Sequence, residues 1–266
     1  LYSVHQSLGA RMRPFGGFEM PVQYSSIMEE HLAVRNEAGL FDVSHMGEFI
    51  VSGAGAEALV QKVATNNAEK LSPGRAMYTV MCNEDGGILD DLLVYKLAAE
   101  QFMLVVNAAN IAKDLDWLRA QNSSGARIRN VSDETALMAL QGPRSVAIAE
   151  KATGLSLEDL TYYRFRSPDP EAFFDSERAV VSATGYTGEK GFELYCDADR
   201  AETIWNAVLK AGEAHGLKPA GLGARDTLRI EAGYCLYGNE ITDSTNPLEA
   251  GLGWLVKLDK GSFIGR

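Results

Sequence analysis

The pattern of apolar and polar positions predicts short strands in hairpin groups, with helices between them. Two β-rich runs flank the turn sequence NEDGG at 83–87, and a third apolar run, QFMLVVNA, follows at 101–108. A second hairpin is predicted over 179–196, around a glycine-rich turn. Because the strands do not alternate strictly with helices, we expect an α+β fold of mixed, largely antiparallel sheets with packed helices.

Helical spacing and capping residues mark the other predicted elements. Ser26 and Glu29 form a capping box for a helix over 25–39, and Gly39 is expected to end it. The stretch 41–53 is expected to form one strand, and 134–142 another. Residues 166–172 are expected to form a surface loop. Further helices are predicted over 55–65, 111–122, 143–154, 200–216 and 223–234.

The run GGILDDLLVY at 86–95 places two aspartates in an apolar, strand-like segment. Neighbouring side chains of a strand point to opposite faces, so Asp90 and Asp91 cannot both face one cavity unless the strand bulges. Burying an ionised carboxylate is expensive unless it is paired. The residues leave two alternatives open: both carboxylates are solvated near the turn, or one of them faces a polar cavity.

Composition narrows the possible functions. The chain of 266 residues has 25 Lys and Arg against 36 Asp and Glu, a formal charge of −11, which disfavours nucleic acids and anionic lipids as partners. It contains no apolar run of membrane-spanning length and begins without the apolar core of a secretory signal. The three scattered cysteines and four histidines show no metal-ligand spacing, so we expect no metal site and a reducing compartment.

Two more segments carry possible chemistry. TGYTGEKGFELY at 184–195 has glycines that allow close approach to a ligand or unusual turns, but its spacing fits neither a dinucleotide site nor a P-loop. Strand alternation directs Glu193 away from Phe192 and Leu194, to water or into a polar pocket. Arg225 begins the predicted helix 223–234 beside Asp226, so an ordinary surface ion pair is the alternative to a binding role.

Taken together, the motifs resemble one family, the aminomethyltransferase or T protein of the glycine cleavage system. The resemblance covers nearly the whole chain with its spacing intact. The stretches that carry it are FGGFEMPVQY, GLFDVSHMGEF, MYTVMCNEDGGILDDLLVY, VVNAAN, LQGP, TGYTGEKGFELY, PAGLGARDTLRIEAGY and NPLEAGLGW.

The resemblance implies an organisation. Residues 1–266 would be the folate-binding catalytic region, built from two interleaved α+β subdomains, and the family's C-terminal barrel domain would be absent from this chain. It also implies a cytoplasmic protein, or a mitochondrial one if the source is eukaryotic.

The resemblance further implies an activity in glycine catabolism and one-carbon metabolism. The enzyme would move a one-carbon unit from the aminomethyl-dihydrolipoyl arm of H protein to tetrahydrofolate, with release of ammonia. Folate would be the acceptor substrate, and lipoylated H protein the partner. No metal, nucleic acid or membrane is implied.

Site residues also follow from the resemblance. The family's essential aspartate falls on Asp91, which would face the folate pocket beside Tyr95, while Asp90 would be structural. Glu193 matches the pterin-binding glutamate, and Arg225 matches a folate-site residue. The other matched pocket positions are Tyr78, Tyr95, Asn107, Tyr162, Tyr186, Tyr234 and Met46.

Relatives with the same fold leave two alternative functions. One is a tetrahydrofolate-dependent demethylase of a small methylated sulfur or amine compound. The other is a folate-binding factor of iron–sulfur assembly, marked by a Lys-Gly-Cys-Tyr-x-Gly-Gln-Glu motif. The corresponding stretch here, AGYCLYGNEI, has the cysteine but lacks that motif. The unbroken GGILDDLLVY favours the aminomethyltransferase.

Overall fold

A computed structural model describes all residues from 1 to 266 and confirms the predicted α+β class. The chain forms two compact units, and each is built from two separate stretches of sequence. Unit 1 contains Leu1–His45 and Asp133–Tyr234, and unit 2 contains Met46–Ser132 and Cys235–Arg266. None of the helices has the length and apolar character needed to cross a bilayer.

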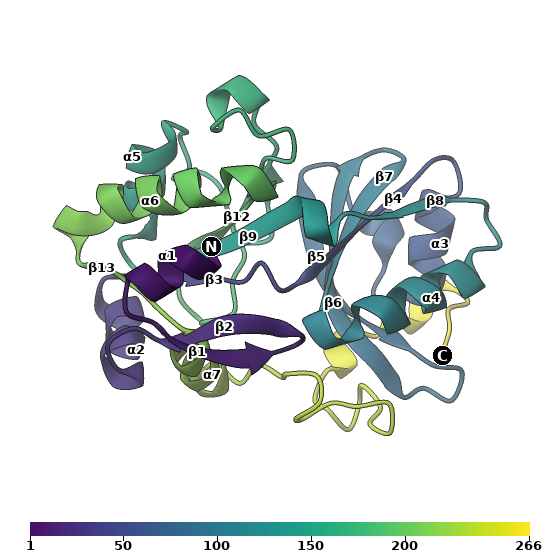
Figure 1. The fold of residues 1–266 in the computed structure, drawn as a ribbon. Coiled ribbons are helices and arrows are strands. Elements are labelled where there is room, and N and C mark those ends of the chain that lie inside the picture. The colour runs from purple at the N-terminus through teal and green to yellow at the C-terminus, as the bar shows by residue number, and fades with distance from the viewer. The chain divides into compact units, whose positions relative to one another are not determined.

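The centre of unit 1 is a six-stranded sheet in the order β10-β11-β12-β9-β3-β13. Figure 1 labels its strands β12, β9, β3 and β13. All its neighbours pair antiparallel except β13 and β3, which pair in parallel. Its strands are β3 (Ala38–Asp42), β9 (Thr135–Gln141), β10 (Phe165–Arg166), β11 (Val180–Ser182), β12 (Gly191–Asp197) and β13 (Leu217–Pro219).

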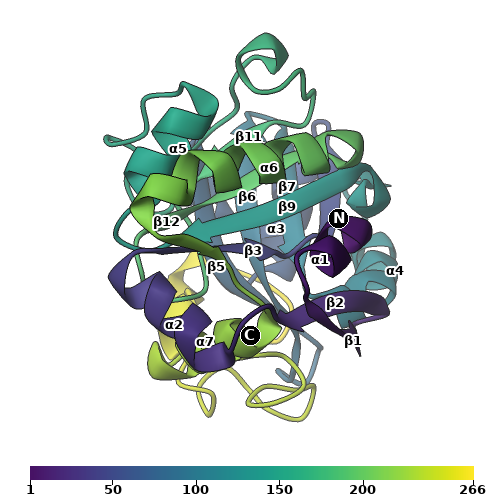
Figure 2. The same cartoon turned by 60° about the vertical axis from the view of Figure 1, so that its left-hand side comes forward.

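Helices α5 (Ser145–Thr153) and α6 (Ala201–Gly212) lie side by side over this sheet, as Figure 2 shows. Their apolar faces close the core of unit 1, in which Trp205 is fully buried. Helices α2 (Ile27–Asn36) and α7 (Leu222–Glu231) pack against each other. Unit 1 also holds α1 (Tyr2–Ser7) and the hairpin of β1 (Arg11–Phe15) and β2 (Phe18–Gln23).

Unit 2 is built on a five-stranded antiparallel sheet in the order β5-β6-β7-β4-β8. Apolar side chains of this sheet pack against α3 and α4, and together they form the core of the unit. Its elements are β4 (Gly47–Ser52), α3 (Ala56–Val63), β5 (Arg75–Cys82), β6 (Ile88–Ala98), β7 (Gln101–Val106), α4 (Ile111–Gln121) and β8 (Arg127–Asn130).

The predicted hairpins and most predicted helices are present, but two local predictions are wrong. Ser26 caps α2 by accepting a hydrogen bond from the Glu29 amide, yet the helix ends at Asn36 and Gly39 lies inside β3. A Cβ at Gly39 would lie 2.4 Å from a methyl carbon of Val34, so this glycine permits close packing of α2 on the sheet. The second wrong prediction is the single strand over 41–53. This stretch contains the end of β3 and all of β4, because the chain turns at 44–46, where it passes from unit 1 to unit 2.

The turn before β6 has a steric constraint of its own. Gly86 has a φ of +87°, in the left-handed region that favours glycine. A Cβ at Gly87 would lie 1.8 Å from the backbone oxygen of Asp243, a separation that backbone atoms cannot accommodate. Both glycines therefore fix how β6 begins, two residues before Asp90.

We predict that Gly87→Ala lowers the free energy of unfolding by about 1–3 kcal/mol, because the added methyl group must displace the backbone at Asp243. Chemical denaturation with urea measures the change. The matched control is Glu84→Ala in the same turn, where the side chain is exposed and stability should stay near that of the wild type. Equal stability of the two variants would contradict the steric argument.

Candidate functional site

The two aspartates of β6 have different surroundings. Asp90 is fully buried. Asp91 lies on the opposite face of the strand, which it shares with Leu89 and Leu93, and all three are half-buried. The alternation expected from the sequence is therefore present, and the alternative in which both carboxylates are solvated is wrong. The surrounding structure must satisfy the buried Asp90 carboxylate.

Asn107 holds both aspartates from the end of β7. Its backbone N–H donates to Asp90 Oδ2 at 3.0 Å, and its Nδ2 donates to Asp90 Oδ1 at 2.8 Å and to Asp91 Oδ1 at 2.9 Å. The Tyr78 hydroxyl of β5 donates to Asp91 Oδ2 at 2.9 Å. Both oxygens of Asp91 are thus held in place, and the structure brings three predicted site residues together: Asp91, Tyr78 and Asn107.

The environment of Asp91 moves its pKa into the neutral range. Burial and the nearby charge of Asp90 raise the pKa of this carboxyl to about 7, although the bonds from Tyr78 and Asn107 oppose the rise. A carboxylate with such a pKa exchanges a proton readily at physiological pH. This is the property that a general base requires.

The other two predicted residues of unit 2 differ in exposure. Tyr95, four residues after Asp91 on β6, is fully buried. Met46 is half-buried immediately before β4. The pocket roles of Tyr95 and Met46 stay predictions.

In unit 1, Glu193 lies on β12 between the fully buried Phe192 and Leu194 and is itself half-buried. Its side chain therefore points to the opposite face of the sheet, as the sequence predicted. The Thr184 hydroxyl donates to Glu193 Oε2. The glutamate is thus a fixed acceptor on the polar side of an otherwise apolar strand.

Three predicted residues of unit 1 stack on one another. The rings of Tyr186 and Tyr234 are 5.7 Å apart with an interplanar angle of 26°. The guanidinium carbon of Arg225 lies 4.4 Å from the centre of the Tyr186 ring, a cation–π contact. The arrangement combines flat apolar surfaces with one positive charge.

Tyr162 is the most exposed of the predicted residues, at 60%. Partial burial and the neighbouring Tyr234, together with the charge of Glu193, raise its pKa to about 12, so its hydroxyl keeps its proton at neutral pH. These interactions place Tyr162 near Glu193 and Tyr234. The five predicted residues of unit 1 therefore form one group.

The glycine-rich loop that carries Tyr186 depends on Gln141, which the sequence analysis did not identify as a site residue. Gln141 Nε2 donates to the Thr184 carbonyl at 3.1 Å, and the Thr187 hydroxyl donates to Gln141 Oε1 at 2.8 Å. A Cβ at Gly185 would lie 2.0 Å from Gln141 Oε1. The close approach that this glycine allows is thus to a neighbouring side chain.

Arg35 of α2 is a second residue that the sequence analysis missed. Its Nη1 donates to the Thr187 carbonyl at 2.6 Å and to Glu189 at 3.0 Å, and its Nη2 donates to Glu231 of α7 at 2.8 Å. It ties the loop to two helices. The sequence contained one signal for Gln141, the motif LQGP. No local pattern indicated a role for Arg35, because the partners of Arg35 are more than 150 positions away along the chain.

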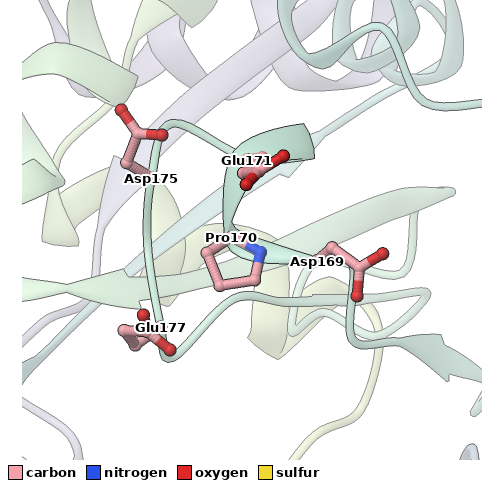
Figure 3. Close-up of a pocket in the computed structure, with 5 residues that line it drawn as sticks. All are labelled: Asp169, Pro170, Glu171, Asp175 and Glu177. Atoms are coloured by element: carbon pink, nitrogen blue, oxygen red, sulfur yellow. The ribbon is translucent and has the colours of Figure 1, made fainter.

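No group of three or more His, Cys, Asp or Glu side chains has an arrangement that could hold a metal ion. A surface hollow in unit 1 lies elsewhere, on the connection between β10 and β11. Figure 3 shows its lining of Asp169, Pro170, Glu171, Asp175 and Glu177. It contains none of the predicted site residues, and its four acidic side chains do not suit an anionic ligand.

Known proteins resemble this chain over its whole length. The aminomethyltransferase of Halothermothrix orenii is 53% identical over 266 residues, which cover 100% of this chain and 73% of that protein. The aminomethyltransferase of Chloroherpeton thalassium is 52% identical over 267 residues, with the same coverage.

The fold also matches a solved structure. The crystal structure of the glycine cleavage system aminomethyltransferase T from Bartonella henselae aligns with a TM-score of 0.91 and 35% identity, over 99% of this chain and 71% of that one. The GCVT N-terminal domain family matches residues 1–260. The membership predicted from the sequence is confirmed: the chain belongs to the aminomethyltransferase (glycine cleavage T protein) family and carries its GCVT N-terminal domain.

Proposed function

We propose that this protein transfers the aminomethyl carbon from the dihydrolipoyl arm of H protein to tetrahydrofolate. The donor group is S–CH2–NH3⁺. Its C–S and C–N bonds break, and two new bonds join the carbon to two folate nitrogens. The two protons lost from those nitrogens pass to the thiolate and to ammonia, which balances the reaction as thiol, ammonium and methylene-tetrahydrofolate.

The observation that carries the proposal is the state of Asp91. Its carboxylate is oriented by Tyr78 and Asn107, and its pKa is raised to about 7. In the reaction it accepts a proton from the attacking folate amine and stabilises the iminium-like cation that develops on the carbon. The family membership supports the assignment, since full-length relatives at 50–53% identity are named aminomethyltransferases.

The residues of unit 1 suit the recognition of folate. A pterin presents paired donors at its 2-amino and N3–H edge, and a carboxylate such as Glu193 is the complementary paired acceptor. The stacked Tyr186 and Tyr234 offer flat surfaces for aromatic rings, and Arg225 offers a charge for an anionic tail. We therefore assign Glu193 and Arg225 to folate binding, while the cytoplasmic location stays a prediction.

The direct test is formation of methylene-tetrahydrofolate from aminomethylated, lipoylated H protein and tetrahydrofolate. Production of methylene-tetrahydrofolate and ammonia in equal amounts would support the proposal. No turnover with this donor, combined with methyl transfer from small methylated sulfur or amine compounds, would reject it in favour of the demethylase.

We predict that Asp91→Asn lowers the turnover number by about 100-fold or more, the usual contribution of a general base. The amide keeps the shape of the side chain, so folate affinity measured by calorimetry should change by less than about threefold. Asp85→Asn in the preceding turn, where the side chain is exposed, is the matched control. Near-normal turnover of Asp91→Asn would remove Asp91 from its role.

Asp91 is also expected to reduce stability at neutral and alkaline pH. The pKa of Asp91 in the folded protein, about 7, lies above the ordinary value of 3.8, so the folded state holds this proton more tightly than the unfolded chain does. The stability that this preference gives is present at low pH and is lost as pH rises through 7. The melting temperature of Asp91→Asn should therefore exceed that of the wild type more at pH 8 than at pH 4. An equal difference at both pH values would show that the wild-type pKa is not raised.

The pH dependence of turnover gives a further prediction. Activity should rise with pH as Asp91 ionises, with an apparent pKa near 7. Tyr78→Phe removes a hydroxyl that donates to the ionised carboxylate, so the rising limb should move to higher pH. A limb that stays in place in Tyr78→Phe would mean that another group controls it.

For Glu193→Ala we predict weaker folate binding by about 1–3 kcal/mol, because the polar edge of the pterin loses its acceptor. Titration calorimetry measures the affinity. Glu202→Ala, at an exposed position of α6, serves as the control and should bind folate normally. Unchanged affinity of Glu193→Ala would reject the pterin assignment.

A further inference from the structure

Asp114 of α4 is a buried acid with no assigned role. It is fully buried, and neither of its carboxyl oxygens receives a hydrogen bond. An ionised carboxylate in that position would carry an uncompensated buried charge, which is far more costly than a neutral acid. The surroundings therefore select the protonated form, which has one O–H donor to offer.

The acceptor for that donor is on β6. Asp114 lies one helical turn after Asn110, whose Nδ2 donates to Asp90 Oδ1 at 2.6 Å. Asp90 Oδ1 thus accepts two hydrogen bonds, from Asn107 and Asn110, while Oδ2 accepts only the Asn107 N–H. A carboxylate has room for about four donors, so one place is left on Asp90 Oδ2.

The electrostatics agree with this geometry. Burial, then the charge of Asp90 and the hydrogen bond to it, raise the pKa of Asp114 to about 10. The other charged groups that act on it are Asp91 of β6, which raises the pKa, and Lys113 of α4, which lowers it. The Lys113 amine donates to the Leu89 carbonyl at 2.6 Å and to the Tyr237 hydroxyl at 3.1 Å.

We propose that Asp114 is a positioning residue for the reaction: as a neutral acid it donates to Asp90, which fixes Asn107 and, through Asn107, the Asp91 carboxylate. This inference rests on the proposed function of Asp91. The bond from Asn107 to Asp91 that Asp114 thereby supports is one of the interactions that lower the pKa of Asp91. Asp114 thereby sets both the orientation and the proton affinity of the base without touching the substrate.

Two variants that keep the branched shape of the side chain separate positioning from packing. Asp114→Asn keeps a neutral donor and should retain wild-type turnover. Asp114→Leu has no donor, so Asp90 should hold Asn107 less firmly and the hydrogen bond from Asn107 to Asp91 should weaken. We expect its turnover number to fall roughly 10- to 100-fold with little change in the KM for folate. Its rising pH limb should move to higher pH, because the weakened bond favours the ionised form of Asp91.

The titration itself is measured by 13C NMR of the protein labelled at aspartate carboxyl carbons. Asp91, Asp90 and Asp114 are assigned from their Asn variants. In the wild type, the Asp114 signal should be that of a protonated acid at pH 8. In Asp114→Leu, the midpoint for Asp91 should be higher than in the wild type, and in Asp114→Asn it should be unchanged.

An ionised Asp114 at pH 8 in the wild type would overturn the inference, and this measurement needs no variant that folds. It would also be overturned if Asp114→Leu kept the wild-type midpoint for Asp91 and wild-type turnover, or if Asp114→Asn were as impaired as Asp114→Leu. The NMR titrations use no substrate. Absence of aminomethyl transfer alongside the expected titrations would therefore count against the proposed function and leave the inference standing.

Discussion

The arrangement of unit 2 depends on satisfying one buried carboxylate, that of Asp90. Three N–H groups from Asn107 and Asn110 surround it, and this requires the chain after β7 to turn back against β6 before α4 begins. Because an unpaired buried charge is costly, these hydrogen bonds favour the conformation in which the connection turns back against β6. Asn107 can then also reach Asp91.

The orientation of the Asp91 carboxylate therefore depends on its buried neighbour, Asp90. Two adjacent acids on opposite faces of a strand divide the work: Asp90 organises the loop, and its charge, together with burial, keeps Asp91 basic enough to take a proton near neutral pH. Unit 1 has a different chemistry, with a fixed carboxylate, stacked tyrosines and an arginine, which suits binding of a flat anionic molecule. This division fits an aminomethyltransferase of the glycine cleavage system, the family to which the chain belongs.

Local patterns were reliable where the physics is local. The NEDGG turn fixed the β5–β6 hairpin, and the bond from the Glu29 amide to Ser26 fixed the start of α2. Predictions failed where packing between elements determines the local structure. Gly39 does not end α2 but lies inside β3, where the absence of a side chain makes room for Val34 of the helix. Gln141 and Arg35 were missed for the same reason, since their partners in the 184–190 loop are far away in the sequence.

By itself the sequence determined the α+β class, the family, and the alternation that places Asp90 and Asp91 on opposite faces of one strand, because hydrophobic periodicity and turn chemistry act over a few residues. Only the tertiary structure decided which aspartate is buried and which is available. It brought Tyr78, Asn107 and Asp114 to this pair from three other elements. Proton affinity depends on burial and on charges across the fold, and neither is encoded at the position of the residue itself.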